Sequence, residues 1–301
     1  MRIGRAAWLT DTGRRRVRNE DAYVFEPPLF AIADGMGGAR AGEVAAGLAA
    51  AALKDGRGTV SDEASLEARI AEANRQVWER SVADPRTAGM GTTVTVAFVD
   101  QPASRVVFGH VGDSRAYRLR GDELEQVTTD HSLVAELVES GVLTPEEAER
   151  HPQRSAITRA VGTERAIEAD VFSLPGEMGD LFLLCSDGLT DMLSETEIAD
   201  VLVAAERDPE AAARALVDAA NAHGGEDNIT VVLFELVEGA AEDAAANGDR
   251  TESEVPSAET GESADAVRTH GAGAGGQLTA LVFLTLLVVV GLLALYWGIK
   301  R

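Results

Sequence analysis

The sequence predicts an α+β fold built of packed layers, and three observations carry this prediction. Residues 91–99 alternate their side chains in steps of two, which is the period of a β-strand. Residues 105–111 and 116–120 form two further strand-like runs around a turn at Gly112 and Asp113. Helical periodicity occurs in separate segments rather than between successive strands, which argues against an alternating βαβ sheet.

The remaining elements follow from the same periodicities. Two apolar runs, residues 180–185 and 229–236, are expected to be buried strands. The apolar run 29–33 ends at Asp34 and is expected to bring that side chain to the end of a sheet. Helical spacing of apolar side chains predicts five helices, at residues 39–53, 65–81, 132–140, 195–205 and 209–222.

Composition argues against several kinds of partner and chemistry. The chain has 27 basic and 50 acidic residues and a net charge of -23, so nucleic acid and anionic membrane surfaces are poor direct partners. The single cysteine, Cys185, lies in an apolar run, where burial makes a thiol unreactive. Cysteine nucleophilic catalysis and an intramolecular disulfide are therefore not expected.

Three zones differ in composition. Residues 1–237 have the mixed periodicity of a folded domain. Residues 238–277 consist mainly of Ala, Gly, Ser, Thr and acidic residues, with nine acids against two arginines, and should form an extended, disordered linker. Residues 278–299 carry no charge and are rich in Leu and Val, which predicts a transmembrane helix.

The predicted helix also suggests a location. At about 1.5 Å per residue it is long enough to cross a hydrocarbon layer, and Tyr296 and Trp297 suit a membrane interface. No signal peptide is recognisable, so we expect a single-pass protein of the cell membrane with its catalytic domain in the cytoplasm. Lys300 and Arg301, after the span, oppose this orientation under the positive-inside tendency.

Carboxylates recur where apolar runs meet turns. Asp34 and Asp187 each follow such a run and precede glycine, and Asp227 precedes another run that begins at Ile229. Three carboxylates converging at a sheet end could bind hard divalent cations such as Mg²⁺ or Mn²⁺, whose preferred ligands are oxygen atoms.

Six short motifs occur along the chain: RVRNED at 16–21, DGMGG at 34–38, GTT at 91–93, GHVGDSR at 109–115, SDGL at 186–189 and DNIT at 227–230. Each motif is weak alone. Together, and in this order, they resemble the bacterial branch of the metal-dependent, type 2C serine/threonine protein phosphatases, and the resemblance covers roughly residues 3–236.

The resemblance implies a central β-sandwich of two antiparallel sheets flanked by helix pairs, with a metal cleft at one end. It also implies a flap formed by the segment around residues 141–160. Two Mn²⁺ or Mg²⁺ ions, and a third in bacterial relatives, would be bound there. Matched to the family motifs, the metal site residues are Glu20, Asp21, Asp34, the carbonyl of Gly35, Asp113, Asp187 and Asp227.

The resemblance gives these residues distinct roles. Asp34 would bridge two ions, and Asp21 would orient the ligands from behind them. Asp113, with Asp187, would bind the third ion. Arg16 matches the arginine that binds the substrate phosphate, a task suited to a planar guanidinium.

The implied function is hydrolysis of phosphoserine and phosphothreonine by in-line attack of a metal-bridging hydroxide. Phosphorylated proteins, and a serine/threonine kinase that the enzyme opposes, are the implied partners. Two alternatives stay open: a silent phosphoprotein-binding scaffold of the same fold, and a phosphatase for small phosphate esters. Met36 replaces the histidine proposed as general acid in eukaryotic relatives, so the general acid is unassigned.

Overall fold

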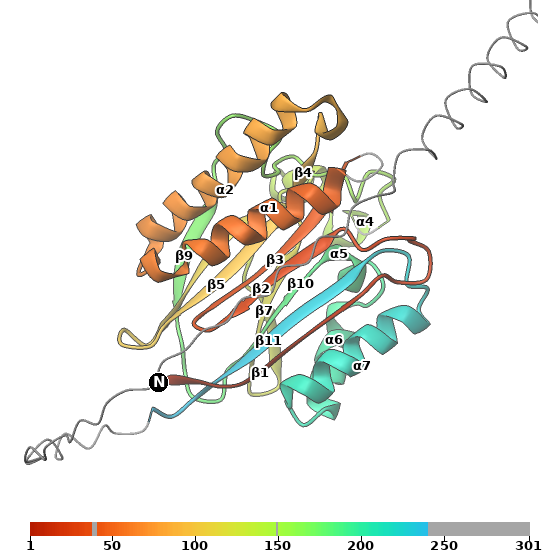
Figure 1. Cartoon of the computed structure of the whole chain (residues 1–301). Helices are drawn as coiled ribbons and strands as arrows, with labels where there is room; N and C mark the ends of the chain where they lie inside the picture. Colours follow the sequence, from red (N-terminus) through yellow and green to blue (C-terminus); the bar gives the residue numbers. More distant parts are fainter. Residues whose placement is uncertain (38–40, 149, 240–301) are drawn as a thin grey trace, which may run out of the picture. The chain divides into compact units, whose positions relative to one another are not determined.

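The computed structural model describes residues 1–37, 41–148 and 150–239 of the chain (Figure 1). Within them, antiparallel strands form two sheets, as the sequence and the family resemblance predicted. The first sheet has the order β1 (Arg2–Asp11), β11 (Ile229–Val237), β10 (Leu181–Cys185), β7 (Arg115–Arg120) and β8 (Glu123–Gln126). The second has the order β2 (Asp21–Glu26), β3 (Leu29–Met36), β5 (Val94–Asp100), β6 (Arg105–Val111) and β9 (Asp170–Pro175), with β4 (Gly91–Thr92) paired to β3.

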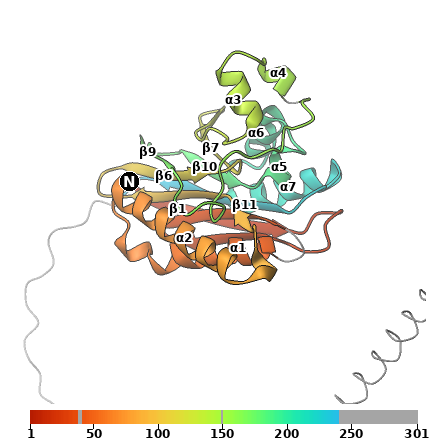
Figure 2. The same cartoon turned by 90° about the horizontal axis from the view of Figure 1, so that it is seen from above.

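A pair of longer helices covers the outer face of each sheet (Figures 1 and 2). Helices α1 (Ala41–Asp55) and α2 (Glu63–Ala83) share one apolar cluster with β3 and β5. Helices α6 (Glu195–Ala204) and α7 (Pro209–Ala222) share another with β10 and β11. The shorter elements are α3 (Leu133–Glu139), α4 (Pro145–Ala148), α5 (Asp187–Thr190) and the 3-10 turns η1 (Arg57–Thr59) and η2 (Pro85–Thr87).

Aromatic side chains join the inner faces of the two sheets. Phe30 of β3 stacks on Phe234 of β11 with ring centroids 4.5 Å apart, and Phe234 also stacks on Phe182 of β10 at 5.1 Å. All three side chains are fully buried. Because successive strand residues face opposite sides, Leu29 and Ala31 project from the other face of β3, into the apolar cluster shared with α1 and α2. The alternation therefore fixes which face of β3 meets which layer.

Helix ends follow local sequence signals. Asp62 caps α2 by accepting a hydrogen bond from the Ser65 backbone amide at 2.9 Å. Asp208 does the same for α7 through the Ala211 amide, and Pro209 occupies the first helical position. Alanines at 45, 46, 49 and 52 give α1 a flat buried face that lies against the sheet. These signals explain why the predicted helices agree with the observed ones to within about two residues.

One predicted strand is divided in two, and the division positions a site residue. Residues 91–99 were expected to be continuous, but β4 ends at Thr92 and β5 begins at Val94. At the break, the Thr93 amide donates to the Asp34 carbonyl at 2.9 Å, and the Thr93 hydroxyl accepts from the Asp34 amide at 2.9 Å. The backbone of Asp34 is therefore held by a side chain as well as by the sheet. Strands β1, β2, β8 and β9 were not predicted.

The described part of the chain contains no helix that is both long and apolar enough to cross a bilayer. The predicted transmembrane helix at residues 278–299 lies outside the described residues, as does nearly all of the predicted linker.

Candidate metal centre and active site

Both sheets contribute carboxylates to the same end of the sandwich. Asp34 lies near the end of β3, opposite Asp21 at the start of β2. Asp187 begins α5 directly after β10, and Asp227 precedes β11, both from the other sheet. Asp113 occupies the turn between β6 and β7. The structure therefore brings together carboxylates that are up to 206 positions apart in the sequence (Asp21 to Asp227).

Burial and mutual repulsion raise the pKa values of these carboxyl groups. Burial, followed by the charges of Asp21 and Asp187, holds the pKa of Asp34 well above its usual value. Burial is also the largest cause for Asp187, whose pKa rises to about 6, and for Asp113, whose pKa rises to about 7. The charge of Asp187 is among the causes of the raised pKa of Asp34, so the two buried carboxyl groups interact across the two sheets. Cations that neutralise this charge would stabilise the ionised forms.

Asp21 is held from behind the cluster by hydroxyl groups. Its Oδ2 accepts hydrogen bonds from Ser186 Oγ at 2.9 Å and from Thr230 Oγ1 at 2.5 Å. Burial raises the pKa of Asp21 to about 7, although these two hydrogen bonds act in the opposite direction. Two neighbours, Ser186 after β10 and Thr230 in β11, therefore fix the carboxyl group, and its role in orienting ligands stays a prediction.

Two glycines allow the backbone to approach Glu20. A Cβ atom on Gly42, in the first turn of α1, would lie 2.5 Å from Glu20 Oε2 and 2.6 Å from the carbonyl oxygen of Gly35. A Cβ on Gly35 would in turn collide with the carbonyl of Gly42. The Glu20 carboxylate and the Gly35 carbonyl therefore lie against the same point of α1. Sequence reasoning predicted Glu20 and Gly35 but missed Gly42.

Arg16 lies at the rim of the cluster, in the loop between β1 and β2. Its Nη2 forms an ion pair with Asp227, and the charges of Asp187 and Asp34 also act on it. The arginine side chain is half exposed, at 52%. The guanidinium therefore lies between the carboxylates and solvent, where a phosphate could reach it.

Asn228 anchors the loop that carries Arg16. Its Nδ2 donates to the carbonyl of Thr12 at 3.0 Å and to the carbonyl of Arg18 at 2.8 Å, one at each end of the loop. Its Oδ1 accepts from the Glu20 amide at 2.8 Å. The backbone amide of Asn228 also donates to the Asp227 carboxylate at 2.8 Å. The larger role of its side chain, closing the loop, was not predicted.

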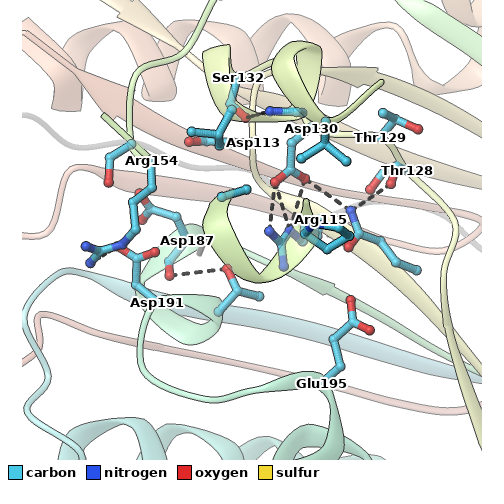
Figure 3. A pocket seen from close by; sticks show the side chains of 18 of the residues that line it. Asp113, Arg115, Thr128, Thr129, Asp130, Ser132, Arg154, Asp187, Asp191 and Glu195 are labelled. Carbon is cyan, nitrogen blue, oxygen red and sulfur yellow. Dashed lines mark hydrogen bonds and ion pairs between the residues drawn. The ribbon is translucent and has the colours of Figure 1, made fainter. Parts of the chain in front are cut away.

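A cavity of about 1110 Å³ opens beside the cluster, and Asp113 and Asp187 are on its wall (Figure 3). It lies between the segment that contains α3 and α4 and the segment that contains α5 and α6. Arg154 forms an ion pair with Asp191 at 3.5 Å within this lining. The predicted flap therefore has a cavity between it and two of the predicted ligands.

Arg115 also lines this cavity, but its guanidinium is already engaged. Its Nε and Nη2 donate to the carboxylate of Asp130 at 2.8 to 3.1 Å. The side chain is only 27% exposed. The bidentate pair accounts for Arg115 without a contact to substrate.

The donor set fits hard divalent cations, although the side chains are not arranged around one point. Among the described residues, no three His, Cys, Asp or Glu side chains already form a group that could hold an ion together. The oxygens Asp21 Oδ1 and Asp187 Oδ1 are nevertheless buried and have no hydrogen-bond partner. Buried carboxylate oxygens without partners, next to a carbonyl and further carboxylates, are the chemistry that Mg²⁺ and Mn²⁺ bind.

Cys185 agrees with its predicted inert role. The thiol is fully buried in β10, and burial raises its pKa to about 12. It is therefore protonated and shielded near neutral pH.

Comparison with known proteins places this chain in one family. The family model for protein phosphatase 2C matches residues 14–221. The serine/threonine phosphatase stp of Listeria welshimeri is 42% identical over 242 residues, covering 76% of this chain and 95% of that protein. The protein phosphatase PhpP of Streptococcus pneumoniae is 41% identical over 245 residues, covering 78% of this chain and 98% of that protein.

Solved structures agree. The Mycobacterium tuberculosis serine/threonine phosphatase PstP/Ppp superposes with a TM-score of 0.74 at 39% identity, covering 78% of this chain and all of that one. The catalytic domain of PstP in complex with two manganese ions gives a TM-score of 0.72 at 36% identity, covering 78% and 99%. The chain belongs to the protein phosphatase 2C family, in its bacterial serine/threonine branch.

Proposed function

We propose that this chain hydrolyses phosphoserine and phosphothreonine in proteins, with Mn²⁺ or Mg²⁺ as cofactor, and so opposes serine/threonine kinases. The observation that carries the proposal is the placement of Arg16 beside Asp227, at the rim of a carboxylate cluster to which both sheets contribute. The family and the names of its members support the same activity.

The residues divide into cation ligands and a phosphate ligand. Glu20, Asp34, Asp187, Asp227 and the carbonyl of Gly35 would hold two ions, with Asp113 and Asp187 available to a third. Divalent cations at such a site neutralise phosphate charge and lower the pKa of a coordinated water. Arg16 would exchange its contact with Asp227 for two hydrogen bonds to the substrate phosphate. The Asn228 contacts keep the Arg16 loop in place during that exchange.

A metal-titrated assay tests this function. The full-length chain is stripped with chelator, and phosphate release from a phosphothreonine peptide and from p-nitrophenyl phosphate is followed as Mn²⁺ is added. We expect a higher kcat/KM for the peptide and loss of both activities in Asp34→Asn. Faster hydrolysis of the small ester would favour the small-ester alternative. Peptide binding without any turnover would favour the scaffold alternative.

We further propose that residues 278–299 anchor the domain in the cell membrane as a single span, with the domain on the cytoplasmic side. The support is the uncharged, Leu- and Val-rich composition of this segment and the acidic linker before it. Fractionation of cells expressing the full chain, and a chain ending at residue 277, tests the anchor. The full chain should sediment with membranes and resist carbonate extraction, and the shortened chain should not. Protease treatment of intact cells then tests the orientation, because a cytoplasmic domain would be protected.

A further inference from the structure

The loop between β1 and β2 concentrates positive charge in a strongly acidic chain. Four of the five residues 14–18 are arginine, although the chain as a whole has a net charge of -23. We call residues 14–18 the arginine loop. Figure 1 shows the loop that joins β1 to β2 extending beyond the strand ends, on the side of the molecule where β11 begins. The charge is therefore placed beside the carboxylate cluster.

Most of this charge is free to meet a ligand. Arg14 has one long contact, 4.0 Å from Asp11, and its side chain is 60% exposed. Arg15 and Arg18 are exposed and form no ion pair with the carboxylates of the described residues. Val17 is 94% exposed, so the loop tip has no packing partner there. Among the described residues of the loop, Arg16 is the arginine that forms a close ion pair, with Asp227.

The base of the loop is held by hydrogen bonds, whereas its arginine side chains are exposed. The amides of Arg14 and Arg15 both donate to the carbonyl of Gly225, at 2.7 and 3.2 Å. Asn228 closes the two ends of the loop, as described above. The other arginines therefore flank Arg16 along a backbone that hydrogen bonds hold at both ends. This arrangement lowers the entropy cost of binding a second anion once Arg16 holds the first.

We propose that the arginine loop selects phosphoproteins that carry further negative charge within about three residues of the phosphorylated serine or threonine. The proposal rests on the proposed function and adds the substrate class. An extended peptide advances about 3.3 Å per residue, so arginines one or two positions from Arg16 can face side chains a few positions from the phosphorylated residue. The negative charge can come from an acidic side chain or from a second phosphate.

Matched peptides test the preference. Four phosphothreonine peptides share one sequence and differ only in the residues that flank the phosphothreonine. On each side of it they carry two Gln, two Glu, two Lys, or one residue with a non-hydrolysable phosphonate. We expect the full-length, Mn²⁺-loaded chain to show a kcat/KM about tenfold higher for the Glu peptide than for the Gln peptide, the ratio expected for three exposed ion pairs acting together. The advantage should shrink as salt is raised. Comparing the Glu and phosphonate peptides distinguishes the two sources of charge.

Two triple variants locate the effect. The variant with Arg14→Gln, Arg15→Gln and Arg18→Gln should lose the preference and keep its kcat/KM for the Gln peptide, which also shows that it folds. The control with Arg2→Gln, Arg57→Gln and Arg214→Gln removes the same charge elsewhere and should keep the preference. Equal rates for the Gln and Glu peptides in the wild-type chain, or a preference that survives in the loop variant, would overturn the proposal.

Two further measurements separate this proposal from its alternatives. First, the same peptides are given a fluorescent label, and their binding to the Asp34→Asn variant is followed by anisotropy. This measurement reports the charge preference even if the chain does not hydrolyse the peptides. Failure of the proposed function can therefore be told apart from failure of the proposed substrate preference. The acidic linker of this chain could itself occupy the loop. In that case the preference would be absent from the full chain and would emerge in a chain ending at residue 237, which would also overturn substrate selection as the role of the loop in the whole protein.

Discussion

Asp21 and Asp34 lie directly opposite each other in the antiparallel pair of β2 and β3. Side chains of such partners project from the same face of a sheet, with Cβ atoms about 5 Å apart. Two carboxylates in this position repel each other, and the charge of Asp21 is the largest cause after burial of the raised pKa of Asp34. The pairing is unfavourable for the sheet and useful for a cation site.

Substituting Asp34 and Asp21 one at a time should distinguish a residue that binds the cation from a residue that orients the ligands. Asp34→Asn should lower kcat by several hundred-fold or more, because it removes charge from the centre of the cluster. Asp21→Asn should lower kcat about 10- to 100-fold, and excess Mn²⁺ should restore part of the lost activity, since Asp21 acts through its neighbours. Initial rates over a Mn²⁺ titration provide the measurement. Equal, unrescued losses would contradict the division of roles.

Metal binding should release protons and strengthen with pH. The pKa values of Asp21 and Asp113 are raised to about 7, and that of Asp187 to about 6, against an unfolded value near 3.8. Between about pH 4 and pH 7 the folded, metal-free protein holds protons that the unfolded chain has lost. Its free energy of unfolding should therefore fall as pH rises through this window. Mn²⁺ needs the ionised groups, so it should raise Tm more at pH 7.5 than at pH 5.5.

Calorimetry in two buffers checks this proton release. Titrations of Mn²⁺ in buffers with different ionisation enthalpies should give different apparent heats, and the difference should be smaller at pH 8 than at pH 6.5. Identical heats in both buffers would show that the carboxyl groups are already ionised before the metal binds.

Gly42→Ala should weaken cation binding without preventing folding. The added methyl would meet Glu20 Oε2 and the Gly35 carbonyl at 2.5 and 2.6 Å, so one or both must move. We expect the Mn²⁺ concentration for half-maximal activity to rise at least tenfold. Gly47→Ala in the same helix is the control, because nothing lies within 4 Å of its Cβ. That change should leave the Mn²⁺ dependence unaltered and stabilise the protein by about 0.5 kcal/mol.

Asn228→Ala should loosen the arginine loop. The substitution removes hydrogen bonds to Thr12, Arg18 and Glu20 from a side chain that is almost fully buried. We expect a loss of about 2 to 3 kcal/mol in the free energy of unfolding and a higher KM for a phosphopeptide. Urea unfolding and steady-state kinetics give the two values. Asn221→Ala, which removes one longer hydrogen bond to Asp11 at 3.2 Å, should cost less than 1 kcal/mol.

The sequence allowed the layers, and the carboxylates that the structure brings together, to be predicted, because both depend on local signals. The apolar runs of β10 and β11 and the capped helices α2 and α7 have clear periodicity or end signals. The aspartates at strand ends could be recognised by the turns that follow or precede them. Their family order then supplied the expected ligand roles.

The residues that sequence reasoning missed act through contacts between distant segments. Strand β1 contains Gly4, Arg2 and Arg5, and it is a strand because it pairs with β11 from the other end of the domain. Thr230 contacts Asp21 across 209 positions, and Asn228 reaches Thr12 across 216. Gly42 has no local signal beyond its residue type, since its importance lies in the space that Glu20 occupies. Such roles depend on packing and cannot be read from periodicity.

The origin of the carboxylates in two separate sheets has a consequence for the newly made chain. Asp34 lies in β3, which is synthesised early, whereas Asp187 and Asp227 lie beside β10 and β11, which are synthesised late. Asp227 is close to the end of the domain. Neither half alone can assemble the cluster. A nascent chain that stops before Asp227 therefore lacks part of the cluster, and we expect dephosphorylating activity only once the segments around Asp34, Asp187 and Asp227 have all been made and folded together.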